Sequence, residues 1–237
     1  MSILSKFLCL PPHKTRGLQS FALHKRGTRA SFALLLALAP LQGHAAEKTL
    51  LAFGDSLTQG YGLPDGQGLV PQLQAWLNAH GADVTIINGG VSGDTTAGGR
   101  ARIDWSLTPD VDAVMVALGG NDILRGLAPA QAKANLDAIL KAVTDKDLPV
   151  LLAGVPVPGN YGTSYQTEFR AIYPDLAAEY DAVLVPDLLA PLAAAQQDDT
   201  KRADYLQPDG LHPSAKGVAL VVEALGPQVL DLLDQVE

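Results

Sequence analysis

Residues 49–58 read TLLAFGDSLT, a short apolar run that ends abruptly in Gly54, Asp55 and Ser56. A run of this length, bounded by turn residues, is typical of a buried strand. Four further runs of the same kind follow along the chain, at residues 84–87, 113–117, 150–153 and 182–185. Short strands without an exposed face are characteristic of parallel sheets. The sequence therefore predicts a sheet of five buried parallel strands.

Longer amphipathic stretches separate these apolar runs. The expected helices cover residues 68–78, 96–105, 129–143, 167–179 and 213–235. Strand and helix alternate five times without an interdomain linker, and parallel strands require crossover connections of this kind. Residues 47–237 are therefore predicted to form a single α/β domain. Its expected architecture is a three-layer α/β/α, flavodoxin-like fold with a five-stranded parallel sheet.

Residues 1–46 differ from the rest of the chain. All their charged side chains are basic, because the first acidic residue is Glu47, and a basic cluster precedes an apolar block at residues 32–41. This order predicts a signal peptide that is cleaved after Ala45 or Ala46, so the expected location is periplasmic or secreted. A membrane anchor is disfavoured, because the apolar block is shorter than the about 20 residues of a spanning helix.

Cleavage of this leader would leave a strongly acidic protein. Eleven of the 17 Lys and Arg residues remain against all 25 Asp and Glu residues, so the formal net charge moves from −8 to −14. Nucleic acid is therefore disfavoured as a partner. The single Cys9 leaves with the leader, and the two remaining histidines, His80 and His212, are too few for most zinc sites. We expect no metal, no thiol chemistry and no stable membrane insertion after cleavage.

Four segments of the mature chain are rich in small and polar residues. They read GDSLT at 54–58, NGGVSGDTT at 88–96, LGGND at 118–122 and QPDGLHP at 207–213. The first three directly follow predicted strands, and the fourth precedes the last helix. Ligands of open parallel sheets bind outside the carboxyl ends of the strands. We therefore expect the four segments to meet at one edge of the sheet.

The four segments contain the groups that acyl transfer by a serine requires. A serine hydroxyl is a weak nucleophile at neutral pH and needs a base whose imidazole is oriented by a carboxylate. Ser56, Asp209 and His212 supply these groups, and the last two lie three residues apart on a loop that contains glycine. The backbone N–H of Gly93 and the amide of Asn121 are suitable donors to an oxyanion.

As a set, the four segments resemble the conserved blocks of the SGNH (GDSL) hydrolase superfamily. The resemblance is greatest to the branch of thioesterase I/lysophospholipase L1-like arylesterases, to which residues 160–162 and 171–174 are also similar. It extends over residues 50–229, nearly all of the mature chain. The resemblance implies the SGNH fold and a serine hydrolase of the arylesterase, acyl thioesterase or lysophospholipase type, without a cofactor.

The resemblance also implies a role for each candidate residue. Ser56 would be the nucleophile that carries the acyl-enzyme, and Asp209 and His212 would complete the catalytic triad. The oxyanion hole would consist of the backbone N–H groups of Ser56 and Gly93 and the side-chain amide of Asn121. The implied substrates are carboxylic esters and thioesters, including aryl esters and lysophospholipids.

The segment GVPVPGNY at residues 154–161 follows the fourth predicted strand and is largely apolar. Such loops at strand ends commonly line binding sites. We predict that Val157, Pro158 and Tyr161 contact the acyl chain of the substrate. An exported enzyme rarely meets coenzyme A thioesters, so lysophospholipids and diffusible esters are the favoured substrates. We expect the protein to be a monomer.

Two other functions remain open. One is a carbohydrate O-acetylesterase of the same superfamily, although an aromatic content of 5% leaves few side chains to stack on sugars. The other is a non-catalytic flavodoxin-like binding module, in which the same segments are turns and Ser56 is a helix N-cap. Asp55, Asp94 and Asp122 lie beside turn glycines and are interpreted as residues that bond to local backbone N–H groups.

Overall fold

The structure, a computed structural model, describes residues 47–193 and 199–236. The predicted signal peptide at residues 1–46 lies outside the described residues and stays a prediction. None of the helices in the described part of the chain combines the length and the apolar composition of a membrane span.

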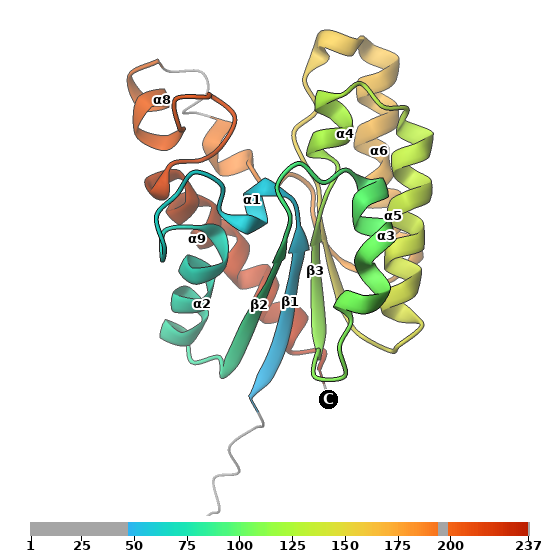
Figure 1. The fold of residues 1–237 in the computed structure, drawn as a ribbon, viewed down its shortest axis with the longest axis vertical. Helices are drawn as coiled ribbons and strands as arrows, with labels where there is room; N and C mark the ends of the chain where they lie inside the picture. The colour runs from blue at the N-terminus through green and yellow to red at the C-terminus, as the bar shows by residue number, and fades with distance from the viewer. Residues whose placement is uncertain (1–46, 194–198, 237) are drawn as a thin grey trace, which may run out of the picture. The chain divides into compact units, whose positions relative to one another are not determined.

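All five predicted strands are present in one parallel sheet (Figure 1). They are β1 (Lys48–Gly54), β2 (Val84–Gly90), β3 (Ala113–Ala117), β4 (Val150–Ala153) and β5 (Val183–Val185). Their order across the sheet is β2-β1-β3-β4-β5, and every neighbouring pair is parallel. This is the strand order of flavodoxin-like folds. The predicted fold class is confirmed.

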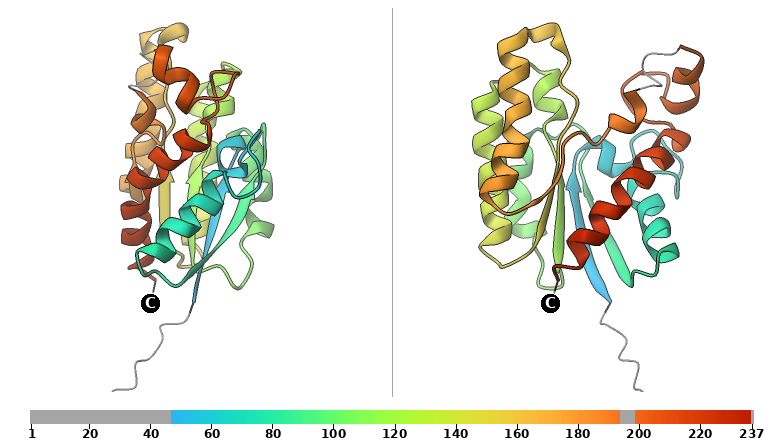
Figure 2. Two further views of the ribbon diagram at one scale, coloured as in Figure 1. Left: turned by 90° about the vertical axis from the view of Figure 1, so that its left-hand side faces the viewer. Right: turned by 180° about the vertical axis from the view of Figure 1, so that it is seen from behind.

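Helices cover both faces of the sheet (Figures 1 and 2). One face carries α2 (Leu69–Ala79) and α9 (Ala215–Leu233), and the other carries α3 (Thr96–Ser106), α5 (Pro129–Thr144) and α6 (Thr163–Glu179). Alternate residues of a strand point to opposite faces. Accordingly, Leu50 and Ala52 of β1 pack into the core beneath α2 and α9, whereas Leu51 and Phe53 pack into the core beneath the other three helices.

The carboxyl ends of four neighbouring strands, β2, β1, β3 and β4, lie level with one another. Gly54 at the end of β1 pairs with Gly90 of β2 and with Ala117 of β3, and Ala117 pairs in turn with Ala153 of β4. The chain therefore leaves the sheet at the same height after each of these strands. This register brings the polar segments that follow the strands to one edge.

The observed helices differ from the predicted ones mainly at their ends. The last helix begins at Ala215 instead of residue 213, because the Ser214 side chain caps it by accepting the backbone N–H of Gly217. The helix α6 begins at Thr163, four residues before the predicted start, and contains Pro174.

Short helical elements were not predicted. They are α1 (Ser56–Gln59), α4 (Gly120–Leu124), α8 (Asp199–Tyr205), η1 (Gly159–Tyr161) and η2 (Ala190–Leu192). Elements of three to seven residues are too short to show a helical period in the sequence. Two of them, α1 and α4, start directly in the candidate segments and determine how the site is built.

Candidate active site

Ser56 is the first residue of α1, immediately after β1. The Asp55 side chain caps this helix, because its Oδ1 accepts the backbone N–H of Leu57 at 3.0 Å. Gly54 is required before the cap, since a Cβ there would collide with the side chain of Thr58 and with the carbonyl of Ala117. The N–H of Ser56 belongs to the first turn, where no intrahelical acceptor exists, so it is free to bind an external oxygen.

Ser56, His212 and Asp209 form a chain of hydrogen bonds. The Nε2 atom of His212 lies 2.9 Å from the Ser56 Oγ, and its Nδ1 lies 2.7 Å from the Asp209 Oδ2. The other carboxylate oxygen, Oδ1, accepts the backbone N–H groups of Leu211 and His212 at 2.9 and 3.0 Å. Both oxygens of Asp209 are therefore fixed, and the imidazole is fixed between the carboxylate and the serine hydroxyl.

The ionisation of Asp209 determines the tautomer of His212. Burial alone would raise the pKa of Asp209, but hydrogen bonds from the backbone of His212 and Leu211 and from the imidazole outweigh it and lower the pKa to about 2. An ionised carboxylate only accepts hydrogen bonds, so in the neutral imidazole the proton resides on Nδ1. The Nε2 lone pair then faces Ser56 and is placed to take its hydroxyl proton.

Two residues that sequence reasoning missed support the imidazole. The Tyr61 ring lies against the His212 ring, with centroids 4.8 Å apart and planes inclined by 41°. The backbone N–H of Gln207 donates to the carbonyl of His212 at 2.8 Å, and the Gln207 side chain donates to the carbonyls of Tyr61 and Pro213. The Tyr61 contacts have no sequence signal, because they join segments about 150 residues apart, and a Gln in a turn does not by itself indicate which carbonyls it will bond.

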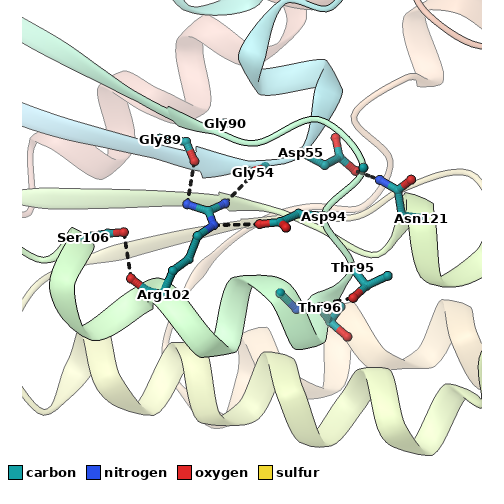
Figure 3. Close-up of polar contacts among 12 residues, drawn as sticks. Gly54, Asp55, Gly89, Gly90, Asp94, Thr95, Thr96, Arg102, Ser106 and Asn121 are labelled. Atoms are coloured by element: carbon teal, nitrogen blue, oxygen red, sulfur yellow. Dashed lines mark hydrogen bonds and ion pairs between the residues drawn. The ribbon is translucent and has the colours of Figure 1, made fainter.

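Asn121 lies in the first turn of α4, and its amide is oriented by Asp55. The Nδ2 group donates to the Oδ2 of Asp55 at 3.3 Å (Figure 3). An amide carries two N–H bonds, so one remains for a ligand. Asp55 is 2% exposed, and burial raises its pKa to about 6 against hydrogen bonds from Leu57 and Asn121 and the charge of His212, which lower it.

Gly93 lies on the exposed loop between β2 and α3 and adopts a φ of 85°. Its carbonyl accepts a hydrogen bond from the Arg125 guanidinium at 2.8 Å. Within the described residues, the backbone N–H of Gly93 has no hydrogen-bond acceptor. Two residues earlier, the N–H of Val91 donates to the carbonyl of Gly54 at 3.0 Å, which joins this loop to the turn that presents Ser56.

The local interpretation of the three aspartates is correct for Asp55 and wrong for the other two. Asp94 binds the Nε of Arg102 at 2.7 Å. The carboxylate of Asp122 accepts the backbone N–H of Thr96 at 2.8 Å and its hydroxyl at 2.7 Å, across 26 residues of sequence. These carboxylates join separate elements of the site instead of stabilising their own turns.

A cavity of about 990 Å³ begins at these groups, and we call it the site cavity. Ser56, Asn121 and His212 line it together with apolar side chains that include Leu124, Val155, Leu184, Leu189 and Leu211. Of the predicted acyl-chain contacts, Val157 and Pro158 line the site cavity. Tyr161 does not line it, and its hydroxyl donates to the carbonyl of Leu124, a wall residue, at 3.4 Å.

The model of the GDSL-like Lipase/Acylhydrolase family matches residues 52–220 of this chain. The chain belongs to this family. Esterase TesA of Pseudomonas aeruginosa is 38% identical to this GDSL family member over 199 residues, which cover 84% of the chain and 96% of the relative. An arylesterase of Vibrio mimicus is 35% identical over 188 residues, covering 78% of the chain and 90% of the relative.

Solved structures of GDSL family members agree with this family assignment. A crystal structure of AlinE4, an SGNH-hydrolase family esterase, is 44% identical, with a TM-score of 0.65 over 80% of this chain and 98% of that one. A crystal structure of TesA is 36% identical, with a TM-score of 0.70 over 78% and 99%. The prediction of an SGNH (GDSL) hydrolase is confirmed, and the chain is a hydrolase of this family.

Proposed function

We propose that this GDSL esterase cleaves carboxylic esters through an acyl-enzyme on Ser56. The observation that carries the proposal is the continuous hydrogen-bond chain from the Ser56 Oγ through His212 to Asp209, at 2.9 and 2.7 Å. His212 removes the serine proton as the Oγ attacks the ester carbonyl carbon. It then returns this proton to the departing alcohol oxygen. Water, activated by the same imidazole, hydrolyses the acyl-enzyme and regenerates the free serine.

The negative charge of the tetrahedral intermediate is stabilised by three donors in this proposal. They are the N–H groups of Ser56 and Gly93 and the second amide proton of Asn121. The first stands at the start of a helix, and the last is attached to a side chain whose orientation is fixed by Asp55. Preorganised donors of this kind are each worth about 3 to 4 kcal/mol of transition-state stabilisation.

The site cavity supports acyl substrates with medium to long chains, such as those of lysophospholipids, besides aryl esters and thioesters. Its volume of about 990 Å³ is far larger than an acetyl group, and Val157 and Pro158 contribute to its wall. A carbohydrate O-acetylesterase, the alternative, would need aromatic side chains that stack on sugar rings, and among the described residues that line the site cavity Tyr173 is the one Phe, Trp or Tyr. Two relatives, 35% and 33% identical, are named arylesterase and thioesterase 1/protease 1/lysophospholipase L1, the latter from Escherichia coli.

Export to the periplasm or the medium is a further part of the proposal. The basic cluster, apolar block and small residues within positions 1–46 support it. Cell fractionation and N-terminal sequencing of the purified protein test it, with a new N-terminus at Ala46 or Glu47 as the expected result. The expected monomer is tested on the same sample by light scattering during gel filtration.

Hydrolysis of a p-nitrophenyl ester series from acetate to palmitate tests the proposed reaction. The protein purified from cells that express the full chain is compared with Ser56→Ala and with Ser164→Ala. The control serine is exposed, and within the part of the chain that the structure describes its hydroxyl bonds only to Glu168, four residues later. We expect Ser56→Ala to abolish turnover and Ser164→Ala to retain it. Wild-type turnover of acetate alone would favour the acetylesterase, and no turnover of any ester would contradict the proposal.

A further inference from the structure

Arg102 is a buried cation on α3 that the proposed reaction does not use. We propose that it is a positioning residue, which holds the loop of Gly93 in register with the turn of Ser56. The inference rests on the proposed function, because it assigns to Arg102 the task of aligning an oxyanion donor with the nucleophile.

The guanidinium contacts both segments at once. Its Nε donates to the Oδ2 of Asp94 at 2.7 Å, its Nη1 to the carbonyl of Gly89 at 2.8 Å and its Nη2 to the carbonyl of Gly54 at 2.9 Å (Figure 3). Gly54 is separated from Ser56 by one residue, and Asp94 directly follows Gly93. The rigid, planar guanidinium therefore joins the end of β1, the end of β2 and the loop of Gly93.

The residues around Arg102 hold its guanidinium in one position. The residue is 9% exposed, and its guanidinium carbon lies 3.9 Å from the centroid of the Phe53 ring. A cation that is removed from water is costly unless its donors are satisfied, and here all three nitrogens have an acceptor. The stacked ring and the three acceptors leave the guanidinium one orientation.

Apart from the contacts of Arg102, few buried hydrogen bonds join the loop of Gly93 to the end of β1. The partner of the Gly93 carbonyl is Arg125, whose side chain is exposed, and the Val91 N–H shares the Gly54 carbonyl with Arg102. Gly93 itself is exposed. The ion pair between Arg102 and Asp94, whose side chains are 11% and 18% exposed, is therefore the shielded contact nearest to the Gly93 N–H.

Loss of this alignment has a specific kinetic signature. The Gly93 N–H binds an oxygen that becomes fully charged only in the transition state, so its displacement lowers kcat and changes KM little. A displacement of about 1 Å is enough to lower a rate about 100-fold. A lysine at this position would keep the positive charge but could not reach three acceptors in one plane.

The experiment compares Arg102→Met and Arg102→Lys with the matched control Arg100→Met in the purified protein. Arg100 lies on the same helix and is exposed, and among the described residues its side chain makes one hydrogen bond, a 3.4 Å contact to Asn135. We measure kcat and KM for p-nitrophenyl butyrate, and count competent sites by titration with p-nitrophenyl diethyl phosphate. Turnover is expressed per titrated site, which removes the effect of any unfolded fraction.

We expect Arg102→Met to lower kcat per site about 100-fold with KM within about twofold of wild type. Arg102→Lys is expected to fall between Arg102→Met and wild type, and Arg100→Met to match wild type. A wild-type kcat per titrated site in Arg102→Met overturns the inference, since Arg102 would then only stabilise the fold. A loss that appears in KM alone overturns it too.

The failure of this inference is distinguishable from the failure of the proposed function. If Ser56→Ala keeps the turnover of wild type, the acyl-enzyme is wrong and the Arg102 inference falls with it. If Ser56→Ala is inactive while Arg102→Met turns over normally, the acyl-enzyme stands and only the positioning role of Arg102 is wrong.

Discussion

The buried carboxylate of Asp122 accepts two hydrogen bonds from Thr96, one from its backbone N–H and one from its hydroxyl. Asp122 follows Asn121 at the start of α4, and Thr96 is the first residue of α3. The pair therefore fixes the helix that carries Asn121, one proposed oxyanion donor, against the helix that follows the loop of Gly93, the other proposed donor. Asn135 donates to the same Thr96 hydroxyl at 3.1 Å, which completes a buried polar network.

Thr96→Val removes the hydroxyl while it keeps the shape of the side chain. The carboxylate of Asp122, which is 1% exposed, then loses one of its two donors from Thr96. Hydrogen bonds to charged groups contribute about 1.5 to 3 kcal/mol, so we expect the free energy of unfolding to fall by about 2 kcal/mol. Urea denaturation measures the change, and Thr96→Ser, which retains the hydroxyl, is the control. A Thr96→Val variant as stable as wild type would contradict this account of the network.

Asp55→Asn changes the pH dependence of stability. The folded protein favours the protonated form of Asp55, because burial raises its pKa from 3.8 to about 6. Ionisation of Asp55 therefore lowers the free energy of unfolding. This effect is absent below pH 3.8, grows as the pH rises to about 6 and then stays constant at about 3 kcal/mol. The amide has no such cost but loses the hydrogen bond from Asn121, worth about 1 kcal/mol.

We therefore expect Asp55→Asn to be about 2 kcal/mol more stable than wild type at pH 8, with no such advantage at pH 4. Urea denaturation at the two pH values measures this difference. Turnover should fall in the same variant, because the Asn121 amide is no longer oriented by a carboxylate. A stability difference that is the same at both pH values would show that Asp55 does not titrate in this range.

Asp209→Asn removes the carboxylate that fixes the tautomer of His212. In wild type its stabilising contribution is present above pH 3.8 and is lost only as the pH falls to about 2, so Asp209 stays ionised throughout the working range. We expect the variant to lose about ten-thousand-fold in kcat at pH 7. A pH profile of kcat/KM tests this, and recovery of wild-type turnover at pH 9 would contradict the tautomer argument.

Val157→Trp fills part of the site cavity. Val157 is 3% exposed and lines the cavity wall, so the larger ring occupies space that a long acyl chain needs. We expect kcat/KM to fall about tenfold or more for p-nitrophenyl palmitate and to stay near wild type for the acetate, since each methylene displaced from an apolar pocket costs about 1 to 3 kcal/mol. The control, Leu220→Trp, changes an exposed residue of α9 that does not line the site cavity. Equal losses on both esters would place Val157 outside the acyl path.

Much of the fold follows from local sequence. The strands 113–117 and 150–153 are predicted to the residue, because Ala113–Ala117 and Val150–Ala153 are buried on every residue and end at turn-forming residues. The segments of Ser56, Asp209 and His212 are recognisable in the same way, since these are reactive residue types in turns at strand or helix ends. The structure brings the three side chains together, and their catalytic roles stay a prediction. In each case the signal lies within a few neighbouring residues.

The missed features depend on contacts between distant segments. Arg102 reads from the sequence as one more polar residue of a helix, and only the assembled sheet brings the carbonyl of Gly54, 48 residues away, to its guanidinium. The site cavity is also formed by segments that lie far apart in the sequence. The composition of the segment with Val157 indicates a binding loop, but Leu189 and Leu211 reach the same cavity from later parts of the chain. No periodicity or motif in the sequence predicts such contacts between distant segments.

The fully buried Tyr173 of α6 connects the substrate side of the site with the turn before Asn121. Its hydroxyl donates to the carbonyl of Leu118 at 3.0 Å, and it occupies the space that a Cβ on Gly119, at a φ of 121°, would need. Tyr173 also lines the site cavity. Laboratory evolution toward bulkier acyl groups that shortens this side chain would therefore also disturb the turn before Asn121, the proposed oxyanion donor. Under the proposed function, a change at Tyr173 would alter acyl selectivity and turnover together, and a variant library that includes it should sample positions 119 and 173 together.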